Sequence, residues 1–158
     1  MLELAEVIRM FDYKDKDVVL SLKNVRQYFS SGFGKRKVVV KAVHNVSFDI
    51  YKGEVFGLVG ESGCGKSTAG RTIMGLYNRT DGKVLFEGRD VHAQVGKDKD
   101  QMLKNMQMIF QDPYASLNPR STVFEIIAEP MEVHGLYQDK RALRERVYEL
   151  LEDVGLNR

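Results

Sequence analysis

A nine-residue segment, GESGCGKST at Gly60–Thr68, constrains the fold of this chain more than any other feature. It follows a short apolar run, EVFGLVG at 54–60, and precedes a helical pattern from Lys66 to about Leu76. The segment fits the template G-x-x-x-x-G-K-[ST], in which backbone N–H groups and one lysine surround phosphate oxygens. An apolar strand, a glycine loop and a helix in this order predict an α/β fold with a phosphate-binding loop.

Each residue type in this loop has its own expected role. The three glycines let the chain wrap without side chains in the way, and the N-terminus of the following helix adds partial positive charge. Lys66 is expected to reach the β- and γ-phosphates, Ser67 to ligate Mg²⁺, and Thr68 to add a hydroxyl or amide contact. The alternative is a flexible glycine loop that binds nothing. The predicted phosphate-binding residues of the loop, which are the ATP-binding residues under the family resemblance described below, are Gly60, Glu61, Ser62, Gly63, Cys64, Gly65, Lys66, Ser67 and Thr68.

Composition narrows the class of protein. The 158 residues are 43% hydrophobic and 29% charged, as in a soluble globular domain, and no apolar run approaches the roughly 20 residues of a membrane span. A net charge of +2 gives no reason to expect a nucleic-acid partner. Cys64 is the only cysteine, which excludes an intramolecular disulfide and favours a reducing compartment.

Hydrophobic periodicity predicts further elements around the loop. Alternation predicts strands at 18–25 and 38–50, joined by a hairpin-like loop, SSGFGKRK, and another short strand at 83–86 between turns. The run at 106–110 is a candidate strand. From Val123 onwards the period becomes helical, with one apolar stripe formed by Leu143, Val147, Leu150, Leu151 and Val154.

Three segments together resemble the ATP-binding subunit of an ABC transporter: the glycine loop, the strand pair before it, and IFQDPYASLNPR at 109–120. The last segment resembles specifically the oligopeptide, dipeptide and nickel importer branch. The resemblance implies an N-terminal extension at 1–17 and part of a nucleotide-binding domain at 18–158. This is a partial P-loop NTPase domain of the ABC type, α/β, with an antiparallel β subdomain, the P-loop strand and helix, and the start of a helical subdomain. The Q-loop and that subdomain are expected at about 112–158.

The resemblance also implies roles for residues outside the glycine loop. Gln111 matches the Q-loop glutamine, whose side-chain oxygen sits near Mg²⁺ and the attacking water, so that the metal residues would be Ser67 and Gln111. Phe29, with Tyr28 as the alternative, falls where the family places an aromatic ring against adenine. Core packing explains such an aromatic residue equally well. The histidines at 44, 92 and 134 share no metal-ligand spacing and are expected to be ordinary surface or packing residues.

The family continues into a signature motif LSGGQ, a Walker B strand with a catalytic glutamate, and a switch histidine, and this sequence contains none of them. The chain therefore resembles only the N-terminal part of the domain, and we expect it to bind ATP and Mg²⁺ without hydrolysing ATP alone. A non-catalytic interaction module of a transporter is the first alternative. A small P-loop kinase is the second, although it leaves QDPYASLNPR unexplained.

Expected partners are membrane permease subunits, a second ATP-binding subunit and, indirectly, a substrate-binding protein. The resemblance places the chain in the cytoplasm, peripheral to the inner face of the membrane. The apolar run Val55–Val59 is expected to form a parallel strand buried on both faces, next to a Walker B strand that the sequence lacks. The exposed edge would then favour self-association.

Overall fold

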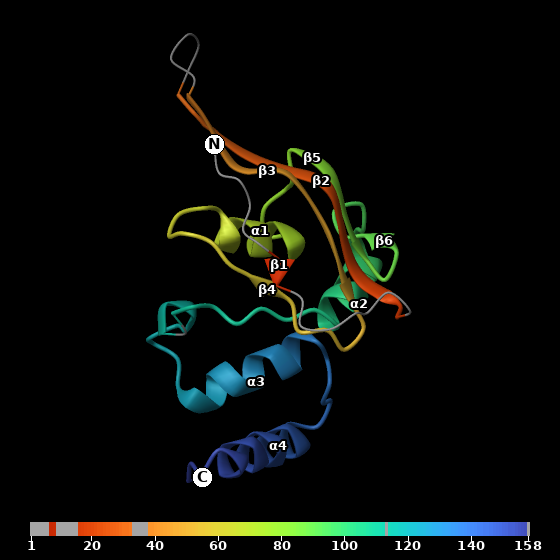
Figure 1. The fold of residues 1–158 in the computed structure, drawn as a ribbon. Coiled ribbons are helices and arrows are strands. Elements are labelled where there is room, and N and C mark those ends of the chain that lie inside the picture. The colour runs from red at the N-terminus through yellow and green to blue at the C-terminus, as the bar shows by residue number, and fades with distance from the viewer. Residues whose placement is uncertain (1–6, 9–15, 33–37, 113, 158) are drawn as a thin grey trace. The chain divides into compact units, whose positions relative to one another are not determined.

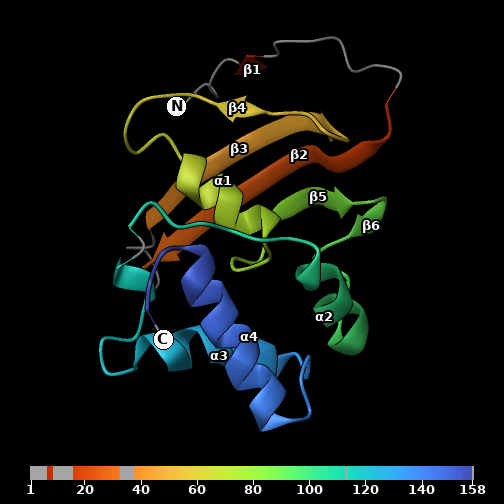
Figure 2. The same ribbon diagram turned by 90° about the horizontal axis from the view of Figure 1, so that it is seen from below.

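The computed structural model describes residues 7–8, 16–32, 38–112 and 114–157. The chain divides into two compact units, residues 1–108 and residues 109–158, which Figures 1 and 2 show from two directions. The first unit contains the sheets and the glycine loop, and the second is helical. None of the helices formed by the described residues is both long and apolar enough to cross a membrane.

An antiparallel sheet of four strands, in the order β3-β2-β5-β6, forms the frame of the first unit. Its bounds are β2 at Val18–Ser31, β3 at Val38–Tyr51, β5 at Asp81–Phe86 and β6 at Arg89–Asp90. The three predicted strands of this sheet are confirmed. The predicted hairpin loop is shorter than expected, because β2 extends to Ser31, and residues 33–37 of that loop lie outside the described residues.

Two asparagines mark an irregularity in the β2–β3 pair. Asn24 and Asn45 have φ values of 51° and 57°, a left-handed conformation that asparagine tolerates better than most residues. The register then shifts twice, because Gln27 pairs with Val43 and Tyr28 pairs with Lys41. Ala42 therefore has no partner on β2, and this extra residue lies beside the glycine loop.

The core of the first unit is formed by side chains from the sheet and from two helices. Helix α1 spans Lys66–Ile73 and lies against one face of the sheet, as Figures 1 and 2 show. Helix α2 spans Gly96–Lys104, which the sequence analysis did not predict, and contributes the fully buried Met102. The buried cluster comprises Leu20, Leu22, Val25, Val43, Val46, Ala69, Val84, Phe86, Val91 and Met102.

Two predicted strands differ in the structure. The run before the loop forms only the short strand β4, Gly57–Leu58, which pairs antiparallel with β1, Val7–Ile8, rather than parallel. Val55 and Val59 are 87% and 53% exposed, so the predicted burial on both faces is wrong for the described residues. The two residues of β4 are half-buried, and Leu58 packs against the core of the first unit.

The predicted strand at 106–110 is also wrong, because these residues adopt no regular structure. Met106 packs on the core of the first unit, and Met108 lies against α1, where a Cβ added at Gly70 would be 3.3 Å from its methyl carbon. Ile109 is 94% exposed. Met106 and Met108 therefore cover the first unit without forming a strand, and a short apolar run cannot distinguish these two roles. Helix α1 itself ends at Ile73, before the expected Leu76.

The second unit is a pair of helices with its own small core. Helix α3 spans Val123–Val133 and α4 spans Lys140–Asp153, preceded by a 3₁₀ turn at Tyr114–Ser116. Thr122 and Glu125 form a reciprocal capping box at the start of α3. The predicted stripe is confirmed in part, since Leu143, Val147 and Leu151 are buried, Leu150 is half-buried and Val154 is 71% exposed.

Candidate functional site

The glycine loop enters α1 through Gly65, whose φ is 97°. The Gly65 carbonyl oxygen accepts the first helical hydrogen bond, from the Ala69 N–H at 2.8 Å. A Cβ at Gly65 would lie 2.2 Å from the carbonyl oxygen of Ala42, the unpaired residue on β3. Both the backbone angle and the close approach therefore require glycine at this position.

Lys66 folds back over the loop. Its Nζ donates to the carbonyl oxygens of Gly60 at 2.5 Å and Glu61 at 2.7 Å, and lies 3.5 Å from the Cys64 sulfur. An ammonium group has three donors and no acceptor, so it can keep carbonyl contacts while turning one N–H to an anion. Its position places a positive charge across the opening of the loop.

The first turn of α1 is free of competing acceptors. The N-cap makes no side-chain hydrogen bond, and the first turn contains no acidic residue. The N–H groups at a helix start lack intrahelical partners, and the helix dipole favours negative charge there. Ser67 is exposed and Thr68 half-buried beside these groups, whereas Cys64 is only 8% exposed. The arrangement can accept an anion at the loop.

Tyr28 and Phe29 project from opposite faces of β2, as neighbours in a strand must. Phe29 meets the ring of Tyr77, which follows α1, edge-on with centroids 5.3 Å apart. Tyr28 instead stacks on His44 at 5.8 Å and bonds its ring nitrogen through the hydroxyl. Phe29 thus lies on the α1 face of the sheet, and Tyr28 on the outer face. A contact of Phe29 with adenine stays a prediction.

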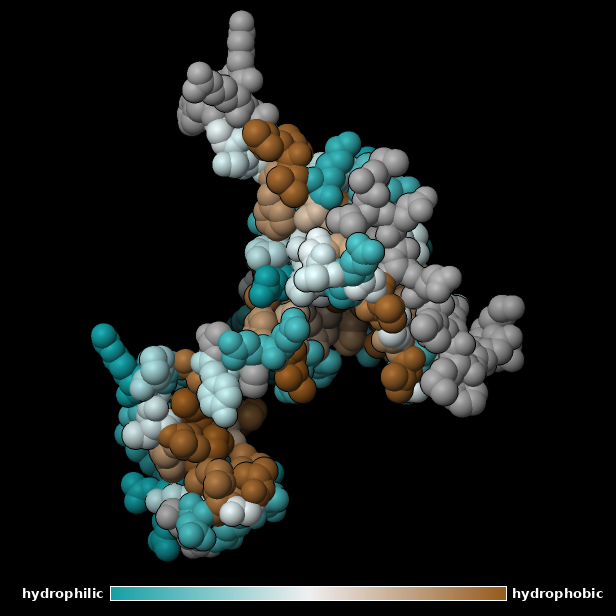
Figure 3. Space-filling model, turned by 60° about the vertical axis from the view of Figure 1, so that its left-hand side comes forward, coloured by the Kyte–Doolittle hydropathy of each residue, from teal (hydrophilic) through white to brown (hydrophobic). Residues whose placement is uncertain are grey.

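Exposed apolar residues continue from Phe29 toward the far end of the hairpin. Phe29 pairs with Val40, and the two are 39% and 57% exposed. Figure 3 shows apolar side chains gathered at this end of the β2–β3 hairpin, where Val38 and Val39 are also exposed. Val40 is a second apolar side chain that the sequence analysis did not single out.

Gln111 belongs to the second unit, and its side chain is exposed just before the 3₁₀ turn. The residues that the first unit brings together at the loop are Gly60–Thr68 and Ala42. The role of Gln111 near Mg²⁺ therefore stays a prediction. The sequence could not point to Ala42, because its contact with the loop is made by the backbone carbonyl oxygen, which every residue has.

Comparison with known proteins identifies the family. The family model described as ABC transporter matches residues 43–158. The chain belongs to the ABC transporter family. This match includes the glycine loop and all of the second unit, and it confirms the resemblance drawn from the sequence.

Several curated relatives of this ABC transporter chain are named as peptide transport proteins. It is 55% identical to the oligopeptide transport ATP-binding protein OppF of Bacillus subtilis over 141 residues, which are 89% of this chain and 45% of the relative. It is 49% identical to the dipeptide transport ATP-binding protein DppF of Lactococcus lactis subsp. cremoris, covering 88% and 44%. The chain spans less than half the length of these relatives. The resemblance to the oligopeptide and dipeptide branch is confirmed.

Solved structures confirm the α/β fold class of this ABC transporter chain. A post-hydrolysis dimer of the ATP-binding cassette MJ0796, bound to ADP and Pi, matches with a TM-score of 0.65 and 26% identity, covering 84% of this chain and 56% of that one. The structure of cbiO1 from Clostridium perfringens, described as part of an ABC transporter complex, matches with a TM-score of 0.63 and 21% identity, covering 89% and 52%. The second likeness concerns the fold alone.

Proposed function

We propose that Gly60–Thr68 binds the phosphate groups of ATP, and that this chain is the ATP-binding portion of a peptide importer. The observation that carries the proposal is the position of Lys66, whose ammonium group lies within 2.7 Å of two loop carbonyl oxygens. Together with the uncapped first turn of α1, it supplies the charge and the N–H donors that a polyphosphate requires. Hydrolysis by this chain alone is not part of the proposal.

The proposal includes Mg²⁺, held by the Ser67 hydroxyl and by oxygens of the nucleotide. Ser67 fits this role because its side chain is exposed in the first helical turn, directly after Lys66. Mg²⁺ prefers oxygen ligands and usually combines one or two protein groups with phosphates and water. When bound, the ion neutralises charge on the phosphates. Gln111 is proposed as a second oxygen donor.

For the base, we propose that adenine stacks on Phe29. Phe29 lies on the α1 face and is 39% exposed, so part of its ring is open to a ligand. Tyr28 is unsuited in comparison, because it faces the other side and its hydroxyl is engaged by His44. Stacking of a base on an aromatic ring contributes about 1–3 kcal/mol.

The wider assignment follows the relatives, whose names describe oligopeptide and dipeptide transport. We propose membrane permease subunits and a second ATP-binding subunit as partners, with a substrate-binding protein acting through them. The chain would then work at the cytoplasmic face of the membrane. We also propose that 18–158 forms part of a nucleotide-binding domain, preceded by an extension at 1–17, with 112–158 as the start of its helical subdomain.

Calorimetric titration with ATP and Mg²⁺ tests the proposal in three proteins: the parent chain, Lys66→Ala, and Lys83→Ala as a control at an exposed lysine on β5. Loss of a charge-assisted hydrogen bond worth about 1.5–3 kcal/mol should weaken binding about 10- to 150-fold in Lys66→Ala alone. Equal affinities for all three proteins would rule out the loop as the phosphate site. A phosphate-release assay on the same samples separates binding from turnover.

A further inference from the structure

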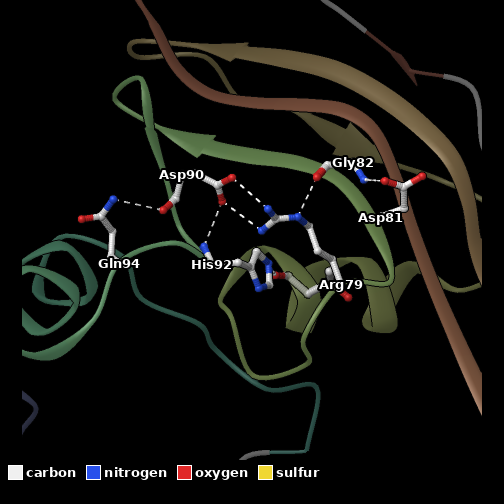
Figure 4. A network of polar contacts seen from close by, with 7 residues as sticks. Arg79, Asp81, Gly82, Asp90, His92 and Gln94 are labelled. Carbon is white, nitrogen blue, oxygen red and sulfur yellow. Dashed lines mark hydrogen bonds and ion pairs between the residues drawn. The ribbon is translucent and has the colours of Figure 1, made fainter.

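An ion-paired network lies near the end of α1 that is opposite to the glycine loop, and Figure 4 shows it from close by. Arg79 meets both carboxylate oxygens of Asp90 at 2.9 Å, and its Nε donates to the Gly82 carbonyl oxygen at 2.6 Å. The two charged side chains are only 20% and 18% exposed. A bidentate pair of this kind has a fixed geometry, so it joins Arg79 to the end of β6, while the contact with Gly82 joins it to the start of β5.

His92, directly after Val91 at the end of this hairpin, connects the network to α1. Its backbone N–H donates to Asp90 at 3.0 Å, and its ring Nε2 lies 2.9 Å from the Thr72 carbonyl oxygen. A carbonyl oxygen can only accept, so Nε2 carries the proton. Burial, and next the charge of Arg79, lower the pKa of His92, which favours the neutral ring in this contact.

Thr72 in turn is hydrogen-bonded to a residue one turn earlier in α1. It is fully buried, and its hydroxyl donates to the Thr68 carbonyl oxygen at 2.8 Å, one turn closer to the loop. Thr68 is the last residue of the loop motif. A continuous series of hydrogen bonds therefore runs from Asp90 through His92 and Thr72 to Thr68.

Helix α1 thus lies close to β3 at its N-terminus and is hydrogen-bonded, near its C-terminus, to the segment that follows β6. At its N-terminus, Gly65 lies against the Ala42 carbonyl on β3, and near its C-terminus, Thr72 is bonded by His92 from the β5–β6 hairpin. An eight-residue helix is too short to be stable by itself, so such tertiary contacts determine its position. Lys66 and Ser67 lie in the first turn and move with it.

We infer that His92 is a positioning residue for the phosphate loop, which holds α1 in the place where Lys66 and Ser67 face the nucleotide. Its effect on ATP affinity rests on the proposed function. Its effect on the order of α1 does not, and can be measured without nucleotide. The hydrogen bond of its ring is with the Thr72 carbonyl oxygen, so its effect on the loop would pass through that residue.

Three variants of the full chain test this inference: His92→Ala, His92→Gln and His44→Ala. Glutamine carries a donor nitrogen as many bonds from Cα as the histidine Nε2, so it can retain the bond to Thr72. His44 is the matched control, because it lies on the outer face of the sheet against Tyr28. The measurements are amide hydrogen exchange by mass spectrometry without nucleotide, and ATP affinity by calorimetry.

In His92→Ala we expect exchange of the α1 amides to become about 2- to 12-fold faster while β2 and β3 are unchanged, and the ATP dissociation constant to rise by a similar factor. His92→Gln should restore both values, and His44→Ala should alter neither. Unchanged exchange in α1 of His92→Ala would overturn the inference. So would equal acceleration over the whole first unit, the mark of a general structural role. If the parent chain binds no ATP, the proposed function fails, and the exchange data still decide the role of His92.

Discussion

Replacing Gly65 with alanine should destabilise the first unit, and the structure gives the size of the effect. The φ of 97° places Gly65 in the left-handed region, which costs a residue with a Cβ about 1–2 kcal/mol. The new Cβ would also lie 2.2 Å from the Ala42 carbonyl oxygen, and such overpacking costs about 1–3 kcal/mol more. The free energy of unfolding should therefore fall by about 2–5 kcal/mol.

Gly63→Ala provides the matched control for this prediction. Gly63 has a φ of 82°, but a Cβ there would meet nothing within 4 Å, so only the backbone term of about 1–2 kcal/mol applies. Urea unfolding followed by circular dichroism gives both free energies, provided the slopes agree. If the two variants are equally stable, the close approach of the loop to β3 is refuted.

Three further predictions concern other parts of the chain. Acidification should lower the free energy of unfolding as pH falls below about 6.5, because burial and Arg79 hold the pKa of folded His92 below its usual value and the unfolded chain takes up the proton first. Urea unfolding at pH 5–8 should therefore show a free energy that depends less on pH in His92→Gln than in the parent chain. Thr122→Ala should lower the free energy of unfolding of the second unit by about 1 kcal/mol, because it removes the side chain that caps the N-terminus of α3. A melting temperature equal to that of the parent chain would contradict the capping box. Phe29→Ala should weaken the binding of ATP and of GTP to a similar extent, and by more than Tyr28→Ala does. If calorimetry gives the reverse order, Tyr28 and not Phe29 is the ring that stacks on the base.

The glycine loop could be predicted because its template fixes both residue types and spacing within nine consecutive positions. The strands β2, β3 and β5 were predictable for a related reason, since alternation is a local property of each segment. Local patterns failed where burial depends on distant neighbours. Val55 and Val59 are apolar yet exposed, and Met106 and Met108 pack on the first unit without extending its sheet.

The contacts that position the candidate site could not be predicted from the sequence, because they join residues far apart in the chain and no sequence motif marks them. Gly65 meets a backbone carbonyl of Ala42, a contact that depends on the register shift in β2 and β3. His92 reaches Thr72 across 20 residues, and its spacing to other histidines suggested only an ordinary packing role. Family position favours Phe29 over Tyr28 as the adenine contact, and the structure adds the physical distinction that the two rings face opposite sides.

Nuclear magnetic resonance of the ¹⁵N-labelled chain, titrated with ADP and Mg²⁺, tests the central claim most directly, since it observes each backbone N–H of the loop. We predict saturable shifts of the amides in 63–68 together with the Lys66 side chain, because the loop amides would exchange water for phosphate and the Lys66 ammonium would turn its remaining N–H to it while keeping the Gly60 and Glu61 carbonyls. The Lys66→Ala variant should lose the shifts at the same ADP concentration. Saturable shifts that leave 63–68 unaffected and cluster elsewhere in the chain would contradict the account.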